Sequence, residues 1–347
     1  MLSGKRSNYV SITEKGEFFM ELLSNLAYCA GGMAGLYYGA EFLVKGGSSV
    51  ARKAGVSSLV IGLTLVAFAT SAPELVVSVK SALNGNADIS LGNVVGSNIC
   101  NIALILGLCA CITPMNVQKQ LLKFDVYVMV GSALLLAVFY YFYHGLSRIA
   151  GLIFFAGFLA YTFWNIYASR KENTAECSEK TGEIPSGEDA AENPPVKENL
   201  YVAIFLVVLG LILLVAGADF FLKSAIYFAK LFKLSDAVIG LTIVAVGTSL
   251  PELATSIVAA CKKESDIAIG NVVGSNIFNI LGILGIAPLI RPIQNAALDL
   301  MDMGMMLVVT LLLWPMMRTN WKLSRKEGAF LLLSYILYIV YLLRHHV

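Results

Sequence analysis

The chain has 347 residues, of which 57% are hydrophobic and only 14% are charged, and its mean hydropathy is +0.74. A soluble domain needs a more polar surface than this composition provides, so the sequence indicates an integral membrane protein. The net charge of +2, without a basic stripe, argues against a nucleic-acid partner. The six cysteines form no CxxC pair, which is typical of small buried side chains rather than of a metal centre.

Ten apolar segments are long enough to cross a bilayer as helices, which takes about 20 residues each. Five lie in each half of the chain, so the predicted fold class is all-α integral membrane with ten transmembrane helices. The predicted spans are 18–50, 57–83, 88–111, 124–143, 149–168, 200–230, 235–261, 266–288, 299–317 and 327–344.

One long polar segment, 169–199, separates the halves 1–168 and 200–347. It carries eight acidic residues and three prolines, and it has too little apolar area to fold alone. We interpret it as an acidic flexible loop that tethers the halves. A calcium-attracting or regulatory role is the alternative.

The placement of basic residues predicts the orientation of the chain in the membrane. With the N-terminus outside and the central loop cytoplasmic, fifteen of the 25 Lys and Arg residues fall in inside segments. The prediction is a multi-pass protein of the bacterial inner membrane in this orientation, surrounded by lipid. Nothing in the sequence fixes the oligomeric state.

The two halves contain copies of one motif. Residues 60–107 align with 238–285 at a constant offset of 178, without a gap and with 29 identities in 48 positions. The copies lie five spans apart, and because five is odd, the second copy crosses the membrane in the opposite direction. Inverted repeats of this kind are typical of secondary transporters, whose site lies near mid-membrane between the repeats. A duplicated packing motif, the alternative, would not need to preserve polar residues inside a span.

The duplicated core places one carboxylate in the middle of the second predicted span of each half. Glu74 follows Thr70-Ser71-Ala72-Pro73, and Glu252 follows Thr248-Ser249-Leu250-Pro251. A carboxylate at that depth costs about 2.5–3.5 kcal/mol, and neither core motif contains Lys or Arg. A mobile cation or a proton is therefore the expected partner. Each proline also removes a backbone donor and frees a carbonyl in the preceding turn.

The next span adds a pair of polar residues in each copy, Ser97 with Asn101 and Ser275 with Asn279. Each pair has i, i+4 spacing and so shares one helix face. Together, the two copies offer only oxygen atoms as ligands, two of the groups being carboxylates. Such a ligand set suits a hard cation such as calcium. His and Cys are missing from the matched positions, which argues against zinc or copper.

The pattern G-[TS]-S-x-P-E followed by G-N-x-x-G-S-N-I, present in both halves, resembles the alpha repeats of the sodium/calcium exchanger family, within the cation/calcium antiporters. The first copy has Ala69 where glycine is usual. The resemblance implies that Glu74 and Glu252 are the central calcium ligands. It implies further oxygens from Thr70 and Thr248, flanking sodium sites lined by Ser71, Ser249, Ser97 and Ser275 with the carbonyls of Ala67 and Ala245, and a ring completed by Asn101 and Asn279.

Both Asn101 and Asn279 depart from many exchangers of this kind, which carry Asp at one or both positions. The double-Asn pattern resembles a bacterial branch of the family, and it leaves the site with two formal charges. One Ca²⁺ balances these charges, whereas three Na⁺ would exceed them. The stoichiometry and the counter-ion therefore stay open.

The predicted function is secondary antiport of Ca²⁺ against Na⁺ by alternating access, without a cofactor. Calcium/proton or potassium-dependent antiport is the alternative, and a cation channel is a remote one. An intramembrane enzyme is not expected, because the three histidines, His144, His345 and His346, lie beside neither motif. A glycine face at Gly31, Gly35 and Gly39 offers a smooth surface for helix movement, with static packing as the alternative.

Overall fold

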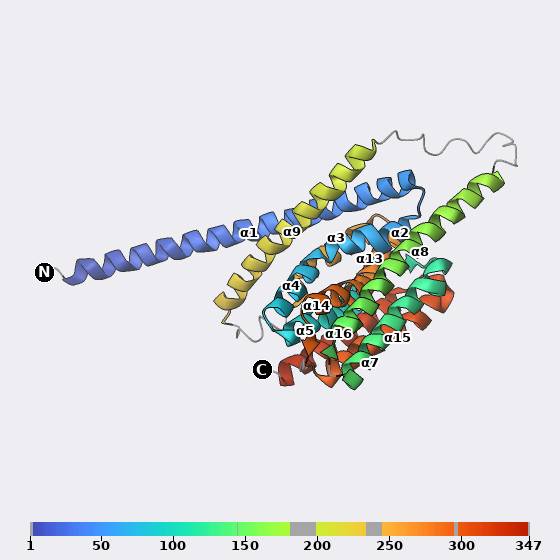
Figure 1. Cartoon of the computed structure of the whole chain (residues 1–347). Helices are drawn as coiled ribbons and strands as arrows, with labels where there is room; N and C mark the ends of the chain where they lie inside the picture. Colours follow the sequence, from blue (N-terminus) through green and yellow to red (C-terminus); the bar gives the residue numbers. More distant parts are fainter. Residues whose placement is uncertain (1–2, 144, 181–198, 234–244, 295–297, 346–347) are drawn as a thin grey trace.

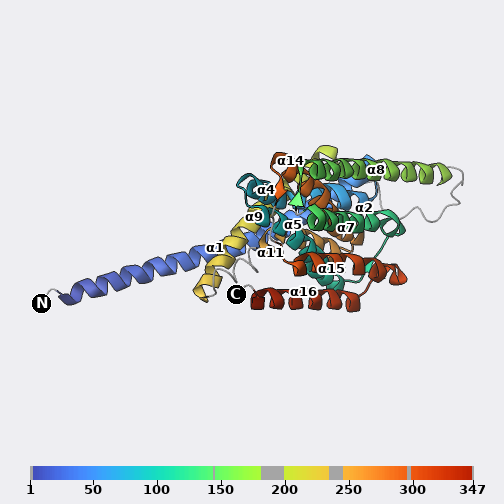
Figure 2. The same ribbon diagram turned by 60° about the horizontal axis from the view of Figure 1, so that its bottom comes forward.

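The computed structural model describes residues 3–143, 145–180, 199–233, 245–294 and 298–345, and these are almost entirely helical (Figure 1). Two long helices, α1 (Ser3–Ala54) and α9 (Leu200–Leu231), cross each other on one side of the molecule. The remaining helices form a bundle beside this crossed pair, and the N-terminal part of α1 extends beyond it (Figures 1 and 2). The long-helix pair therefore joins the two halves beside the bundle.

Glycines allow α1 and α9 to approach until their backbones touch. A Cβ atom at Gly217 would lie 2.7 Å from the backbone nitrogen of Leu36, and one at Gly39 would lie 2.8 Å from that of Leu214. The glycine face predicted for α1 was wrong at one position. A Cβ at Gly31 would meet nothing within 4 Å, whereas one at Gly32 would lie 2.6 Å from the backbone of α9. The contact face is therefore Gly32, Gly35 and Gly39.

This contact predicts opposite effects for the same substitution at two positions. Gly217→Ala forces the two backbones apart, and overpacking of this kind costs about 1–3 kcal/mol. Gly31→Ala adds its methyl group in open space and favours the helix slightly. We expect thermal unfolding of the purified protein to shift to lower temperature for Gly217→Ala only. Equal shifts in both variants would contradict the close approach.

Two continuous helical spans form the centre of the bundle. They cover Ala87–Ile112 and Ser265–Ile290, and 72% and 83% of their apolar windows are buried, against 28% for the outermost spans. Each contains a π-helical segment directly after the motif G-N-V-V-G-S-N-I. The central elements are α5 (Ala87–Ile99), η2 (Cys100–Leu106), α6 (Gly107–Ile112), α13 (Ser265–Ile277), η5 (Phe278–Ile283) and α14 (Leu284–Ile290).

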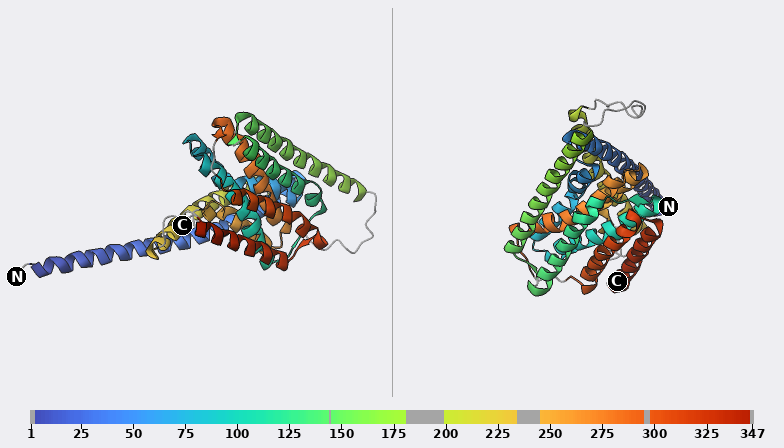
Figure 3. Two further views of the ribbon diagram at one scale, coloured as in Figure 1. Left: turned by 90° about the horizontal axis from the view of Figure 1, so that it is seen from below. Right: turned by 90° about the vertical axis from the view of Figure 1, so that its right-hand side faces the viewer.

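Four outer helices cover the central pair, and they are exchanged between the halves. The helix α8 from the first half packs on α14 and η5 of the second half, while α16 packs on α6 and η2 of the first (Figure 3). The halves are therefore interlocked rather than placed side by side. The outer elements are η3 (Leu121–Asp125), α7 (Val126–Tyr143), α8 (Arg148–Lys180), α15 (Leu300–Arg318), η6 (Thr319–Trp321) and α16 (Arg325–His345).

The duplicated Pro-Glu motif interrupts its helix. In the first copy the helix stops at Thr70 and resumes at Ala72, with a bend of 48°. Proline stands in the first turn of the new helix, where its missing N–H costs nothing. The elements of the two copies are α2 (Ser58–Ile61), η1 (Gly62–Val66), α3 (Ala67–Thr70), α4 (Ala72–Leu83), α11 (Ala245–Gly247) and α12 (Leu250–Cys261).

Short strand pairs join loops from opposite halves. The strand β1 (Met115–Asn116) pairs with β4 (Lys322–Leu323), and β2 (Gly145–Leu146) pairs with β3 (Ile293–Gln294), both antiparallel. The order of the ten predicted spans puts the loops that carry β1 and β4 on one side of the membrane. It puts the loops that carry β2 and β3 on the opposite side. The pairing thus connects loops that this order assigns to a common side.

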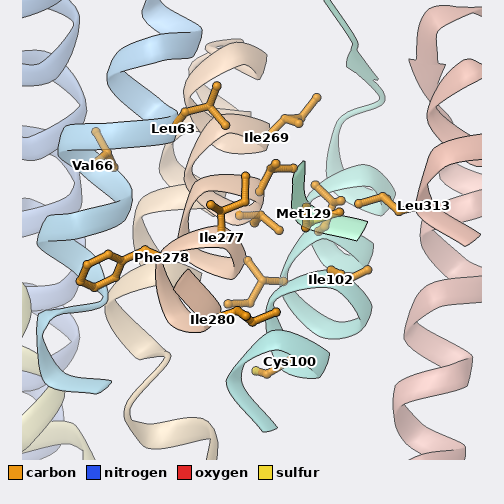
Figure 4. Close-up of a cluster of buried hydrophobic side chains, with 14 of the residues drawn as sticks. Leu63, Val66, Cys100, Ile102, Met129, Ile269, Ile277, Phe278, Ile280 and Leu313 are labelled. Atoms are coloured by element: carbon orange, nitrogen blue, oxygen red, sulfur yellow. The ribbon is translucent and has the colours of Figure 1, made fainter. Parts of the chain in front are cut away.

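Apolar side chains from both halves fill the space between the central helices and their neighbours. Figure 4 shows Leu63, Ile102, Ile277 and Leu313 in one cluster, together with Met129 from α7. Burial of this kind, from segments distant in sequence, fixes the relative position of the two motifs.

The predicted spans are only partly recovered. Seven helices of the described residues are long and apolar enough to cross a membrane, or eight if the bent pair Ser58–Thr70 and Ala72–Leu83 is one span. Part of the predicted span 235–261 lies outside the described residues, as do His144 and most of the predicted loop 169–199. The start of that loop was wrong, because α8 continues through Lys180.

Candidate cation site

The breaks at Ser71 and Ser249 have nearly the same backbone conformation, with φ and ψ of −84° and 8° at Ser71 and of −88° and 10° at Ser249. Each serine precedes a helix that carries a glutamate in its first turn, Glu74 in α4 and Glu252 in α12. A helix N-terminus favours a negative charge. Both carboxylates have no solvent-exposed area, so their charge is enclosed by protein.

The two motifs exchange hydrogen bonds across the interface of the halves. The Ser71 hydroxyl donates to Oε1 of Glu252 over 2.7 Å, and the Ser249 hydroxyl donates to Oε1 of Glu74 over 3.2 Å. Each serine thus serves the carboxylate of the other motif rather than its own. This reciprocal pairing brings the two glutamates to one place.

Further predicted site residues lie around this pair. Ser97 Oγ lies 3.4 Å from Ser249 Oγ. The carbonyl oxygen of Ala67 lies 3.4 Å from Thr70 Oγ1 and 3.5 Å from Ser275 Oγ. The structure therefore groups oxygens from both copies of the motif around the carboxylates.

Asn101 and Asn279 are both buried, and each donates its amide nitrogen to an asparagine in the repeat of the opposite half. Nδ2 of Asn101 donates to Oδ1 of Asn276 over 3.1 Å, and Nδ2 of Asn279 donates to Oδ1 of Asn98 over 3.5 Å. Their own carbonyl oxygens receive no hydrogen bond. Those oxygens therefore keep their full capacity to bind a ligand.

Five buried side-chain oxygens of the predicted set have no hydrogen-bond partner. A buried acceptor without a partner costs about 1–3 kcal/mol, and more if it is charged. Among the described residues, neither glutamate pairs with Lys or Arg. All five atoms can act as acceptors, so each is a candidate ligand for a cation. They are Glu74 Oε2, Glu252 Oε2, Asn101 Oδ1, Asn279 Oδ1 and Thr248 Oγ1.

All the predicted ligand roles stay predictions, and for Ala245 the described residues do not give a contact at the site either. Ala245 is the first residue of α11, directly after the undescribed residues 234–244. Its first-half counterpart, Ala67, has its carbonyl beside Thr70 and Ser275. The structure thus places the Ala67 carbonyl at the site but gives no such contact for Ala245.

Two further asparagines support the glutamates, and the sequence reasoning missed them. Asn93 donates to the Glu74 carbonyl over 3.3 Å and to Ser78 Oγ over 2.9 Å. Asn271 makes the matching contacts with the Glu252 carbonyl and Ser256, at 3.4 Å and 3.0 Å. Thr70 Oγ1 also lies 3.1 Å from Asn271 Oδ1. The signal was available, because both asparagines belong to the unchanged repeat G-N-V-V-G-S-N-I.

The arrangement is that of an enclosed, oxygen-lined cation site. Two carboxylates, two amide carbonyls and several hydroxyls match the ligands that Ca²⁺ and Na⁺ prefer. No group of three His, Cys, Asp or Glu residues suited to a metal occurs in the described part of the chain. These oxygens make the site a candidate for binding hard cations in a multi-helix membrane protein.

Comparison with known proteins identifies the family. The family described as "Sodium/calcium exchanger protein" matches residues 24–167 and 202–344. The sodium/calcium exchanger MaX1 of Methanosarcina acetivorans is 36% identical over 336 residues, which cover 90% of this chain and 96% of MaX1. The putative antiporter CaxA of Alkalimonas amylolytica is 38% identical over 317 residues, covering 88% and 95% of the two chains.

A solved structure shares the whole architecture. The sodium-calcium exchanger NCX_Mj, soaked without Na⁺ and Ca²⁺, has a TM-score of 0.77 and 34% identity to this chain. The match covers 92% of this chain and 99% of NCX_Mj. This chain belongs to the sodium/calcium exchanger family, and it is a multi-pass membrane transporter of inorganic cations.

Proposed function

We propose that this protein exchanges Ca²⁺ for Na⁺ across the membrane by alternating access, with both ions bound at the Glu74–Glu252 pair. The observation that carries the proposal is the set of five enclosed acceptor oxygens without a partner, two of them on carboxylates. The hydrogen bonds between the motifs hold these carboxylates at one place. A site of this composition requires a cation to be stable in the bilayer.

The charge of the site gives a reason for exchange rather than leak. With Asn at 101 and 279, the formal charges at the site are those of Glu74 and Glu252, and one Ca²⁺ neutralises them. An empty site leaves two like charges buried together, which is strongly unfavourable. The protein therefore changes its conformation with the site occupied and not with the site empty.

Alternating access requires movement, because both glutamates are closed off from solvent in this structure. The crossed pair α1 and α9 is the element that we propose to move. The helix α1 packs on η1 and α12, and α9 packs on α3, α11 and α12, so the pair contacts both copies of the motif. The glycine contact face lies between α1 and α9 and holds them close together, so we propose that the two helices move as one unit.

We also propose the complete topology of ten spans in two inverted five-helix repeats. The support is the repetition of contacts at a constant offset: Ser71 with Glu252 matches Ser249 with Glu74, and the strand pairs are exchanged in the same way. The proposed organisation is 1–168 and 200–347 around the segment 169–199. The N-terminus lies outside and the central segment is cytoplasmic, in a bacterial inner membrane.

Calcium/proton or potassium-dependent exchange is the second candidate, and one observation favours it. Both site amides are neutral, so two carboxylates are the charged groups available to bind the returning ions. Protons or fewer monovalent ions would match that charge better than three Na⁺.

Calcium flux into proteoliposomes under imposed gradients tests the proposal. We expect uptake of Ca²⁺ when Na⁺ is loaded inside, and little uptake under a proton or potassium gradient alone. Uptake driven equally by a pH gradient would favour the second candidate. Passive calcium flux that needs no counter-ion would indicate a channel and contradict antiport.

A further inference from the structure

Two relays, each a row of three contacting side chains, begin at the site asparagines, and each relay combines residues from both halves. In the first relay, Nδ2 of Asn101 donates to Oδ1 of Asn276, and Nδ2 of Asn276 lies 3.8 Å from the sulfur of Met129. In the second relay, formed by Asn279, Asn98 and Met306, Nδ2 of Asn98 lies 3.9 Å from the Met306 sulfur. Asn98 and Asn276 have no role in the site as derived above.

The methionine at the end of each relay gives it a direction. A thioether sulfur accepts hydrogen bonds but cannot donate one, so the amide of Asn276 turns its NH₂ group towards Met129. Its oxygen must then face Asn101, whose NH₂ group it receives. Met129 lies among apolar side chains such as Ile102 and Ile277 (Figure 4), so the sulfur has few competing donors.

The consequence reaches the ion site. Once the NH₂ group of Asn101 is held outward by Asn276, its oxygen Oδ1 points the other way, and that oxygen is buried without a donor. An amide that turned over would present two N–H groups to a bound cation. The relay therefore decides whether position 101 attracts or repels the transported ion.

We propose that Asn276 and Asn98 are positioning residues that hold the oxygens of Asn101 and Asn279 towards the ion, with their own orientation set by Met129 and Met306. The inference rests on the proposed function, because it assigns a task at the same site. The relays also favour an amide over a carboxylate at positions 101 and 279, since the outer atom of that side chain must donate to a carbonyl oxygen.

The duplication supports a shared task for the two relays. Asn98 and Asn276 are separated by 178 residues, as are Asn101 and Asn279, while Met129 and Met306 are separated by 177. The residues between each motif and its methionine differ in sequence, yet the same three atom types meet in the same order in both relays.

The test is a double-mutant cycle with Ca²⁺ binding to the purified full chain measured by calorimetry. Asn276→Leu keeps the size of the side chain but removes the acceptor, and we expect about tenfold weaker binding, the value of one lost hydrogen bond to a site group. Asn101→Asp alone should stay within about threefold of wild type. The double variant should also return to within about threefold, because a carboxylate offers an oxygen in either orientation and needs no acceptor beside it.

Rescue separates positioning from a merely structural role. If Asn101→Asp fails to improve binding in the Asn276→Leu background, or if Asn276→Leu binds as wild type, the proposal is overturned. Should Asn276→Leu not fold, the matching variants Asn98→Leu and Asn279→Asp carry the same test. Glu252→Gln in the same assay distinguishes failure of the proposed function from failure of the relay proposal. Calcium binding retained by Glu252→Gln overturns the proposed function. Calcium binding lost in Glu252→Gln, together with no rescue of Asn276→Leu by Asn101→Asp, overturns only the relays.

The methionine step has a matched control on the same helix. Met306→Leu removes the acceptor that orients Asn98, and we expect calcium binding to weaken about threefold. Met303→Leu makes the same chemical change at an equally buried position of α15; the amide of Asn98 donates to the sulfur of Met306 and not to that of Met303, so this variant should leave binding unchanged. Equal effects of the two substitutions would show that the sulfur of Met306 does not orient the amide.

Discussion

Glu252→Gln is expected to abolish calcium uptake in proteoliposomes while the protein still folds. The substitution keeps the shape of the side chain, and the glutamine oxygen still accepts from Ser71. It removes one of the two charges that balance Ca²⁺, and loss of one partner of a buried charge set costs about 3–5 kcal/mol. That is more than a hundredfold in affinity. Glu74→Gln should behave in the same way, because Glu74 occupies the equivalent place.

The control for this prediction is Glu264→Gln, which neutralises a carboxylate that caps α13 through its backbone, outside the site. It should transport calcium as the wild type does. An elution profile and a thermal unfolding transition like those of the wild type would show that the Glu252→Gln variant is folded. Normal calcium flux in either site variant would refute the central role of the glutamate pair.

Asn279→Asp is expected to change the sodium dependence of transport more than the calcium affinity. It adds a third carboxylate to the site, whose charge then matches three Na⁺. The calcium ligands already include two carboxylates, so the additional charge matters less for Ca²⁺. Initial rates of calcium uptake as a function of internal Na⁺ concentration measure the effect, and we expect steeper dependence on Na⁺ in the variant.

Asn86→Asp supplies the control, since it adds the same charge at an exposed helix cap between α4 and α5. It should leave the sodium dependence unaltered. A similar change in both variants would attribute the effect to surface charge. An unaltered sodium dependence in Asn279→Asp would count against our interpretation of the neutral amides.

Much of the site was predictable because the duplication preserves chemistry as well as hydrophobicity. Glu74 and Glu252 stand out as carboxylates inside apolar spans, and Ser97 with Asn101 can be placed on one face from their spacing. The supporting residues Asn93 and Asn98 were within reach too, since both repeat unchanged. Their task was not, because it depends on atoms supplied by other helices, such as the sulfur of Met306.

Helix boundaries and faces were less predictable, for local reasons. The acidic composition after 169 suggested a loop, but α8 continues through Lys180, and Arg, Lys, Glu and Ala, which favour helix, make up most of residues 169–180. For α1, the even spacing of Gly31, Gly35 and Gly39 was right for Gly35 and Gly39 but wrong for Gly31, which makes no contact. Two neighbouring glycines, Gly31 and Gly32, offer nearly equal patterns, and only the position of α9 selects Gly32.

The sequence by itself determined the membrane class, the duplication, and the presence of paired carboxylates that need a cation. These follow from composition and from the cost of burying charge, which hold for any arrangement of the helices. The tertiary structure decided which residues of the two motifs meet. Ser71 donates its hydrogen bond to Glu252 and not to Glu74, because the helix break turns each serine towards the opposite half. The sequence pattern of one helix does not contain the placement of that helix relative to another.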